Sequence, residues 1–485
     1  IKNKLNRFKN SVKILSSVNC SYFRRRFFMK KMKKVVALGL TSLIGMSAIL
    51  SGCGGGNNSG TDTKAEQKAE SEEKGAKETG DSNALHLTFY YPVNVGGSAA
   101  ALIEKICEDF NAENKDIVVE PVYTGNYDDT VTKIQTAVQG GTPPDLFVSL
   151  ATQRFTMAST GMAMPLDDLI ASDADGKAYI DDFLPSFMED SYVDGKIYSI
   201  PFQRSTEILY YNKDKFKEAG LDPESPPKNW DELLEDAKKL TNDSCYGVGI
   251  ALNSGSAQWT FTGFSLENSE DGKMLMSEDG KKVFFNTPEN VEALQFWLDL
   301  QNKHKVMAEG VVQWTDLPTQ FLAGEVAMMY HTTGNIANIN KNATFEYGTC
   351  FMPGKKQFGA ATGGGNFYIS SGISEDRVKA AWKFIKFATD TEKAAQWALD
   401  TGYVPTRKSC YETDMIKKYY EEVPQAKVAY EQLQYAKPEL TTYNAAEIWR
   451  VLNDNIQSAV TGDVTAKEAL DNAQSEAEGI LEEYQ

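Results

Sequence analysis

Short apolar runs alternate with amphipathic stretches from Leu85 onward. The runs Leu85–Tyr91, Ile117–Thr124 and Leu146–Leu150 have the length and composition of buried strands. The stretches between them, Ser98–Glu113 and Tyr127–Gln139, repeat apolar residues at helical spacing. Because strands that alternate with helices usually pair in parallel through crossover connections, this pattern predicts an α/β fold with a mostly parallel sheet and helices on both faces.

The same alternation continues to the end of the chain. The further strands that it predicts lie at Glu207–Tyr211, Tyr246–Leu252, Val326–Tyr330 and Asn366–Ser370, and the further helices at Trp230–Leu240, Pro288–Asn302, Asp376–Thr389, Glu392–Asp400, Tyr443–Val460 and Thr465–Tyr484. About 400 residues of this kind exceed what a single hydrophobic core usually organises, so we expect two domains.

The segment before this region has the pattern of a secretory signal. The apolar run Val35–Leu50 follows the lysine-rich residues 30–34 and leads into Ser51, Gly52 and Cys53. A basic start, a short apolar run and small residues at a cleavage site are typical of signal peptides. The Cys resembles that of bacterial lipoprotein signals, which implies that Cys53 becomes the lipidated N-terminus. An ordinary secretory signal with a chance Cys is the alternative.

The N-terminal boundaries follow from these patterns. Residues 1–28 begin with Ile, contain no acidic residue and precede Met29, so we interpret them as upstream translation and 29–52 as the lipoprotein signal peptide. Cys53 begins the segment 53–84, whose residues 54–83 include no aromatic or large aliphatic side chain. Such a segment buries too little apolar surface to fold, so we predict a disordered linker.

Charge and cysteine usage exclude several classes of protein. The first 52 residues contain 12 of the 50 Lys and Arg and none of the 67 Asp and Glu, so the rest of the chain carries a net charge near −29. Because such a surface repels polyanions, nucleic acid is not an expected partner. The four remaining cysteines are widely spaced, with no His at ligand spacing, so we expect neither a metal nor a cofactor.

Catalytic motifs are missing from the sequence. It has three His, and it contains neither a GxSxG nucleophile motif nor an HExxH zinc motif. Together with the signal for export, this favours a binding protein that is not an enzyme. A lipid-anchored hydrolase of glycans or phosphodiesters is the alternative, and a sensor or adhesin is a third possibility.

Aromatic residues and a glycine run are the candidates for ligand binding. The chain has 22 Tyr, 24 Phe and 7 Trp, and aromatic faces pack well on the C–H faces of sugars and polyols. Core packing is the alternative for each one. Several fall at predicted strand ends or in loops: Tyr90, Tyr91, Tyr127, Trp259, Trp314, Tyr368, Tyr403 and Trp449. The run Gly363–Asn366 comes just before a predicted strand, where it can present backbone N–H groups to a ligand or form a plain loop.

Eight spaced segments carry a family resemblance that extends from Leu85 to the C-terminus. They begin at Phe110 (FNAEN), Gly125 (GNY), Gly141 (GTPPD), Pro201 (PFQRST), Tyr210 (YYNKD), Ala219 (AGLDP), Pro227 (PKNWDEL) and Thr401 (TGYVP). Together they resemble the extracellular solute-binding proteins of ABC importers (family 1), in the cluster that binds carbohydrates and polyols. The run from Leu209 to Trp230 is especially similar to the branch that binds sn-glycerol 3-phosphate.

The resemblance implies a set of ligand-binding residues. They are Tyr127, Ser205, Thr332, Thr333, Gly363, Gly364 and Tyr403. The chain departs from the branch at two positions, with Leu150 in place of a Glu that would hold glycerol hydroxyls and Trp449 in place of an Arg that would hold the phosphate. Either Arg204 supplies a replacement cation for an anionic ligand, or Trp449 stacks on a neutral saccharide.

The resemblance also implies the architecture and the function. It predicts a two-lobed fold of the periplasmic-binding-protein kind (type II), with lobe one over 85–201 plus 363–408 and lobe two over 202–362 plus 409–485. Each lobe would be a mostly parallel sheet flanked by helices. A monomer outside the cytoplasmic membrane, held there by lipid on Cys53, would close its cleft on a carbohydrate or polyol, either an oligosaccharide or a compound like sn-glycerol 3-phosphate. It would then deliver this ligand to the permease subunits.

Overall fold

A computed structural model describes residues 84–93, 99–253 and 256–485. The predicted signal peptide, Cys53 and the linker lie outside the described residues. Within the described ranges, no helix combines the length and the apolar character needed to cross a bilayer.

The described strands form one mixed sheet and a separate two-stranded hairpin. In the large sheet the strands follow the order β2-β1-β3-β10-β6-β8-β7, with β11 added beside β10 and β9 beside β6. The bounds are β1 Leu85–Tyr91, β2 Ile117–Tyr123, β3 Leu146–Leu150, β6 Ile200–Asn212, β7 Tyr246–Gly249, β8 Val326–Thr332, β9 Tyr347–Cys350, β10 Ala360–Ile369 and β11 Ala436–Pro438, and the hairpin is β4 Tyr192–Val193 with β5 Lys196–Ile197.

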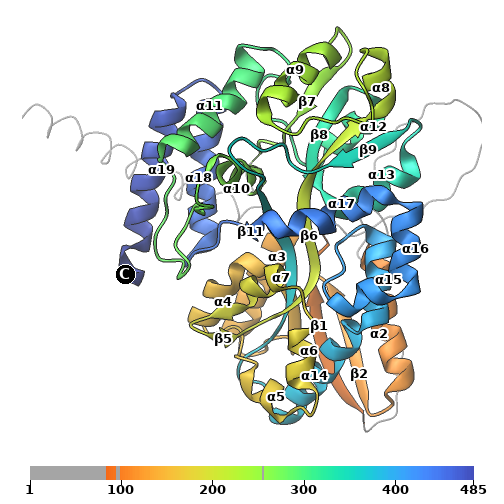
Figure 1. The fold of residues 1–485 in the computed structure, drawn as a ribbon. Helices are drawn as coiled ribbons and strands as arrows, with labels where there is room; N and C mark the ends of the chain where they lie inside the picture. Colours follow the sequence, from red (N-terminus) through yellow and green to blue (C-terminus); the bar gives the residue numbers. More distant parts are fainter. Residues whose placement is uncertain (1–83, 94–98, 254–255) are drawn as a thin grey trace, which may run out of the picture. The chain divides into compact units, whose positions relative to one another are not determined.

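Along this order the pairing is parallel at the two ends of the sheet and antiparallel in its middle, and the added strand β11 pairs in parallel with β10. Strand β1 pairs in parallel with β2 and β3, and β7 pairs in parallel with β8. In the middle, β10 runs antiparallel to both β3 and β6, and β6 runs antiparallel to β8. Strand β6 pairs with β10 through its first half and with β8 and β9 through its second half, so it joins the two ends of the sheet (Figure 1).

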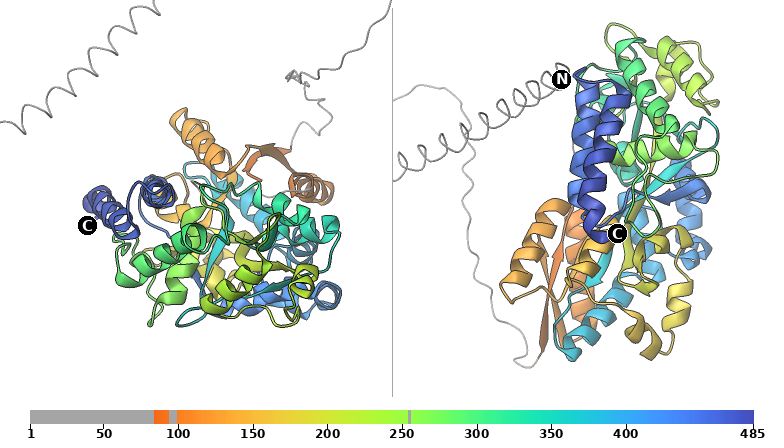
Figure 2. Two further views of the ribbon diagram at one scale, coloured as in Figure 1. Left: turned by 90° about the horizontal axis from the view of Figure 1, so that it is seen from above. Right: turned by 90° about the vertical axis from the view of Figure 1, so that its left-hand side faces the viewer.

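The described helices lie on both sides of this sheet (Figures 1 and 2). Their bounds are α2 Ala99–Glu113, α3 Tyr127–Gln139, α4 Arg154–Ser159, α5 Asp167–Ser172, α6 Gly176–Asp181, α7 Pro185–Met188, α8 Lys213–Glu218, α9 Trp230–Leu240, α10 Ala257–Asn268, α11 Pro288–Asn302, α12 Leu317–Ala323, α13 Ile336–Asn342, α14 Glu375–Ala388, α15 Thr391–Thr401, α16 Asp414–Glu422, α17 Pro424–Gln432, α18 Ala445–Val460 and α19 Ala466–Leu481. Figure 2 shows α18 and α19 side by side at the C-terminal end of the chain.

Two large hydrophobic clusters lie at opposite ends of the sheet. The first core includes Phe89, Phe110 and Phe384 and draws its residues from 87–202 and 367–403. The second core includes Trp230 and Trp297 and draws its residues from 184–187, 209–360 and 404–481. Because neither core is built from one continuous stretch of chain, the chain passes between them several times, including along β6 and β10.

The glycine run lies inside a strand rather than before one. Strand β10 begins at Ala360, so Gly363, Gly364 and Gly365 pair with β6, and the expectation that the run precedes the strand is wrong. Gly364 has a φ of +96°, and a Cβ placed on it would come within 1.8 Å of the Gln203 carbonyl oxygen. Only glycine therefore allows β10 to approach β6 this closely.

Candidate functional site

A cavity of about 300 Å³ lies where the two cores meet. Its walls include Tyr127 and Tyr403, which belong to the first core, and Trp449, which belongs to the second. Ser205 of β6 and Gly364 of β10 also line it, so the two strands that join the ends of the sheet form part of its wall. A concave space of this kind, built from several segments, is the usual form of a small-molecule site.

Most of the residues that the sequence indicates as ligand contacts lie in the walls of this cavity. They are Tyr127, Ser205, Thr332, Gly364, Tyr403 and Trp449, together with Leu150 at the departing position. Thr333 lies behind the wall, where its Oγ1 accepts a hydrogen bond from the Thr206 backbone N at 3.4 Å. Gly363 contacts Trp259 instead, because a Cβ on it would come within 2.5 Å of that indole ring.

Arg204 lies outside the cavity lining. Successive side chains of a strand point to opposite faces, so Ser205 faces the cavity and Arg204 faces away from it. The Arg204 side chain is fully buried and donates to Asp190 Oδ2 at 2.6 Å and to Asn366 Oδ1 at 3.2 Å. Its guanidinium therefore belongs to a structural network, and this arrangement does not offer it as a cation to a ligand.

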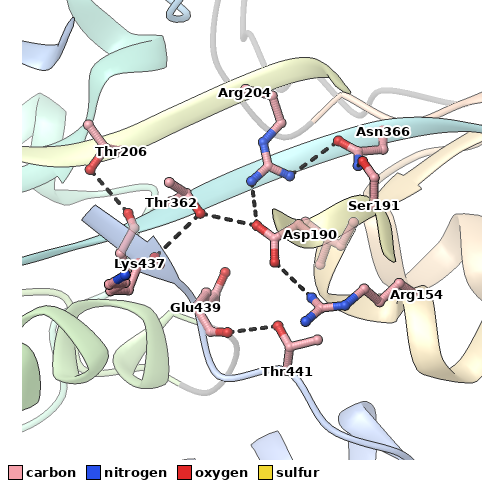
Figure 3. A network of polar contacts seen from close by, with 12 residues as sticks. Arg154, Asp190, Ser191, Arg204, Thr206, Thr362, Asn366, Lys437, Glu439 and Thr441 are labelled. Carbon is pink, nitrogen blue, oxygen red and sulfur yellow. Dashed lines mark hydrogen bonds and ion pairs between the residues drawn. The ribbon is translucent and has the colours of Figure 1, made fainter. Parts of the chain in front are cut away.

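This network of buried polar contacts ties several elements together (Figure 3). Asp190 accepts from Arg154 at 2.7 Å through Oδ1 and from Arg204 and Thr362 through Oδ2. Asn366 in turn donates to the hydroxyls of Ser191 at 3.3 Å and Ser199 at 2.9 Å. Because two arginines share one buried carboxylate, removing Asp190 would leave two unpaired buried charges close to each other.

Two tyrosine hydroxyls meet at one side of the cavity. Tyr127 is the first residue of α3, where Asn126 and Asp129 form a capping box that fixes the start of the helix. Its hydroxyl donates to Gln203 Oε1 at 2.8 Å and also interacts with the hydroxyl of Tyr403. Burial raises the pKa of both phenols, so both remain uncharged and able to exchange hydrogen bonds with a polar ligand.

Three tryptophan rings and Leu150 form the apolar part of the wall. The rings of Trp259 and Trp314 lie 5.6 Å apart, and Trp314 stacks on His331 with 3.8 Å between ring centroids. Trp259 Nε1 donates to the Ala361 carbonyl at 3.3 Å, and Trp449 Nε1 donates to the Leu440 carbonyl at 2.8 Å. These hydrogen bonds occupy the polar edges of both indoles and hold them in place, which suits the rings to stacking contacts.

His331 is part of this support and carries no charge. Asn335 Nδ2 donates to its Nδ1 at 2.8 Å, so its Nε2–H donates to the Trp314 carbonyl at 3.1 Å. Burial lowers the pKa of His331 to about 4. The imidazole is therefore neutral at physiological pH and serves to position Trp314.

The cavity walls also include residues that sequence reasoning did not single out. They are Asn126, Asp128, Asn253, Ser256, Gln258, Thr315 and Glu439. Trp259 and Trp314 were recognisable only as aromatics outside predicted helices. Asn253 gave a usable signal, because it directly follows the apolar run Tyr246–Leu252 and polar residues after a strand are frequent in sites. Glu439 gave none, because it follows β11, a three-residue strand that the apolar pattern does not predict.

Comparison with known proteins identifies the class. The model of the family "Bacterial extracellular solute-binding protein" matches residues 105–425, and the chain belongs to this family. Its relatives include the sn-glycerol-3-phosphate-binding periplasmic protein UgpB of Escherichia coli (strain K12), which is 30% identical over 410 residues that cover 80% of this chain and 91% of that protein. UgpB of Pectobacterium atrosepticum is 29% identical over 433 residues, which cover 84% and 93% of the two chains.

Solved structures agree with this assignment. UgpB from Mycobacterium tuberculosis in complex with glycerophosphocholine has a TM-score of 0.72 and 25% identity and covers 81% of this chain and 98% of its own. Maltose-bound MalE3 of T. maritima has a TM-score of 0.71 and 26% identity, and the match covers 82% of this chain and 100% of that chain. The predicted family and the predicted type II periplasmic-binding-protein fold are thereby confirmed.

Proposed function

We propose that this chain is the solute-binding component of an ABC importer and captures a carbohydrate or polyol in the cavity between the two cores. Its family supports a binding role, and its relatives bind glycerophosphocholine, maltose or, by name, sn-glycerol 3-phosphate. One observation carries the proposal for this chain: the cavity combines indole faces with tyrosine, serine and threonine hydroxyls. Sugars and polyols need this combination, because they present C–H faces and hydroxyl groups together.

The lobe boundaries are part of this proposal. Lobe one comprises 85–201 plus 363–408, and lobe two comprises 202–362 plus 409–485. The two cores support this division, because each lobe then contains most of one core. Contacts from both lobes to one ligand would favour the closed arrangement of the cleft. The permease subunits would then recognise the closed surface.

The location outside the cytoplasmic membrane and the lipid on Cys53 are also proposals. They rest on the signal sequence, and the family description agrees with export. In cells that express the full chain, mass spectrometry of the N-terminal peptide should find acylated Cys53, and Cys53→Ala should release the protein from the membrane fraction. An unmodified Cys53 in mature protein would contradict lipidation. The same preparations, sized by light scattering, should contain monomers.

Calorimetry on the purified chain tests the binding function itself. We would titrate maltotriose, ribitol, glycerophosphocholine and sn-glycerol 3-phosphate, and recover each compound for chemical analysis. Stoichiometric binding of one compound, recovered unchanged, is the expected result. Failure of the whole panel to bind, or conversion of a bound compound, would overturn the proposal.

A further inference from the structure

A chain of three hydrogen-bonded residues ends at the wall of the cavity. The Gln258 backbone N donates to Asn453 Oδ1 at 2.9 Å, and Asn453 Nδ2 donates back to Gln258 Oε1 at 2.7 Å. Gln258 Nε2 then donates to Glu439 Oε1 at 3.2 Å. Both Gln258 and Glu439 line the cavity, yet Glu439 is only 4% exposed. A carboxyl group this deeply buried in a site needs a defined set of partners.

The backbone N–H of Gln258 fixes the direction of every hydrogen bond in this series of three residues. A backbone N–H can only donate, so the atom of Asn453 that it meets is the oxygen. The Asn453 nitrogen must then donate to the oxygen of Gln258, which leaves the Gln258 nitrogen facing Glu439. Among the described residues, only Gln258 donates to this carboxyl, so Oε2 is the oxygen left for a molecule in the cavity.

Among the described residues, no cation forms an ion pair with Glu439. The charged groups that act on it are Asp190, Glu207 and Arg204, and the Arg204 guanidinium is paired with Asp190 at 2.6 Å. In Figure 3 both arginines of the network are directed at Asp190, and no dashed line joins either of them to Glu439. A buried carboxylate without a paired cation is costly, so the neutral acid is the favoured form. In agreement, burial raises the pKa of Glu439 well above its ordinary value, and Asp190 and Glu207 add to the effect.

We propose that Glu439 contacts the ligand as an uncharged carboxylic acid, donating a hydrogen bond from Oε2–H to a hydroxyl or ring oxygen of the ligand. Because Oε1 already accepts from Gln258, the proton resides on Oε2, the oxygen available to the cavity. This inference rests on the proposed function, since it assigns one contact in the same cavity. It makes Glu439 a determinant of specificity for ligands that present uncharged oxygen atoms.

Two substitutions of Glu439 test whether this residue contacts the ligand as a neutral acid or as a carboxylate. In Glu439→Gln, the new amide can accept from Gln258 through its oxygen and donate to the ligand through its nitrogen, as the neutral acid does. We expect the affinity for the tightest-binding compound of the panel to fall less than threefold in Glu439→Gln and at least tenfold in Glu439→Leu, by calorimetry on the full chain. Glu476→Leu, at an exposed position of α19, is the matched control and should leave the affinity unchanged.

A spectroscopic measurement covers the case in which Glu439→Leu fails to fold. The infrared difference spectrum on ligand addition should contain a shifted carboxylic-acid C=O band that is missing in Glu439→Gln. Equal losses of affinity in the Gln and Leu variants, full affinity in the Leu variant, or absence of that band would each overturn the inference while leaving ligand capture intact. If no compound binds the unmodified chain, the proposed function fails with it.

Discussion

Arg204 donates to the Asp190 carboxylate at 2.6 Å, and both side chains are excluded from solvent. Arg154 donates to the other oxygen of the same carboxylate at 2.7 Å. Two positive charges therefore depend on one negative charge in a region of low dielectric. The network joins α4 and the segment that contains Asp190 to β6, and through Asn366 and Thr362 to β10.

We predict that Asp190→Asn destabilises the protein severely. The substitution leaves both guanidinium groups buried without a counter-charge, for which a loss of about 3–5 kcal/mol is typical. Chemical denaturation of the full chain measures the free energy of unfolding. Asp109→Asn is the control, because its partner Lys105 lies 3.0 Å away in a largely exposed pair, and it should cost less than about 1 kcal/mol. Similar losses for both variants would show that the buried network contributes little.

Truncation of the two cavity tyrosines should weaken ligand binding. Tyr127→Ala and Tyr403→Ala each remove a ring and a hydroxyl from the wall, so we expect at least a tenfold loss of affinity, about 1.4 kcal/mol. Calorimetry with the best compound of the panel measures the effect. If both variants bind as tightly as the unmodified chain, the ligand lies elsewhere.

Phosphate monoesters should bind poorly to this cavity. The described lining contains the carboxyl groups of Asp128 and Glu439 and no Lys, Arg or His, and Arg204 is engaged by Asp190. We therefore expect sn-glycerol 3-phosphate to bind at least tenfold more weakly than the best uncharged compound, about 1.4 kcal/mol. Affinity for the uncharged compound should also be insensitive to salt between low and high ionic strength. Tight, salt-sensitive binding of the phosphate would show that a cation reaches the ligand.

Glu207 should make stability depend on pH. Burial raises the pKa of this carboxyl from 4.5 to about 8, although the Thr260 hydroxyl donates to it at 2.7 Å. Between pH 5 and pH 8 the folded state therefore holds a proton that the unfolded state releases. The contribution of Glu207 to the free energy of unfolding is fully present below pH 4.5. It falls as pH rises toward 8, by at most about 1.4 kcal/mol per pH unit.

Glu207→Gln tests this assignment. The amide cannot ionise, so the fall in the free energy of unfolding between pH 5 and pH 8 should be shallower in the variant than in the unmodified chain. The slopes must be compared because Glu267 and Glu439 also have raised pKa values, so they too make the free energy of unfolding decrease as pH rises. Parallel slopes for the two proteins would show that Glu207 does not titrate in this range.

The sequence predicts the outer elements of the fold better than its centre. Strand β1 and helices α3, α9 and α11 begin and end where the pattern places them, because one side of each helix is polar and the flanking turns are clear. Strand β6 was predicted only over Glu207–Tyr211, whereas it begins at Ile200. Its residues from Gln203 to Thr206 are polar but buried, and no alternation rule identifies a strand whose polar groups bond to other elements.

Helix α10 was missed for a related reason. It is buried on nearly every side, so its residues Ala257–Asn268 have no polar face that would produce helical periodicity. The candidate site, too, could be predicted only in part from the sequence. Most of the residues that the family resemblance indicates lie in the wall, but the position of Arg204 depends on which face of β6 it occupies, and Glu439 becomes part of the site only through the folded path of the chain.

The alternation of side chains along β6 has a practical consequence for engineering. Under the proposed function, exchange of Ser205, the β6 residue that lines the cavity, should alter ligand preference, while Arg204 on the reverse face keeps its ion pair with Asp190. At this point of β6, the proposed ligand contact and the anchor of the buried network occupy opposite faces of the strand. A library for a biosensor would therefore vary Ser205 and leave Arg204 unchanged.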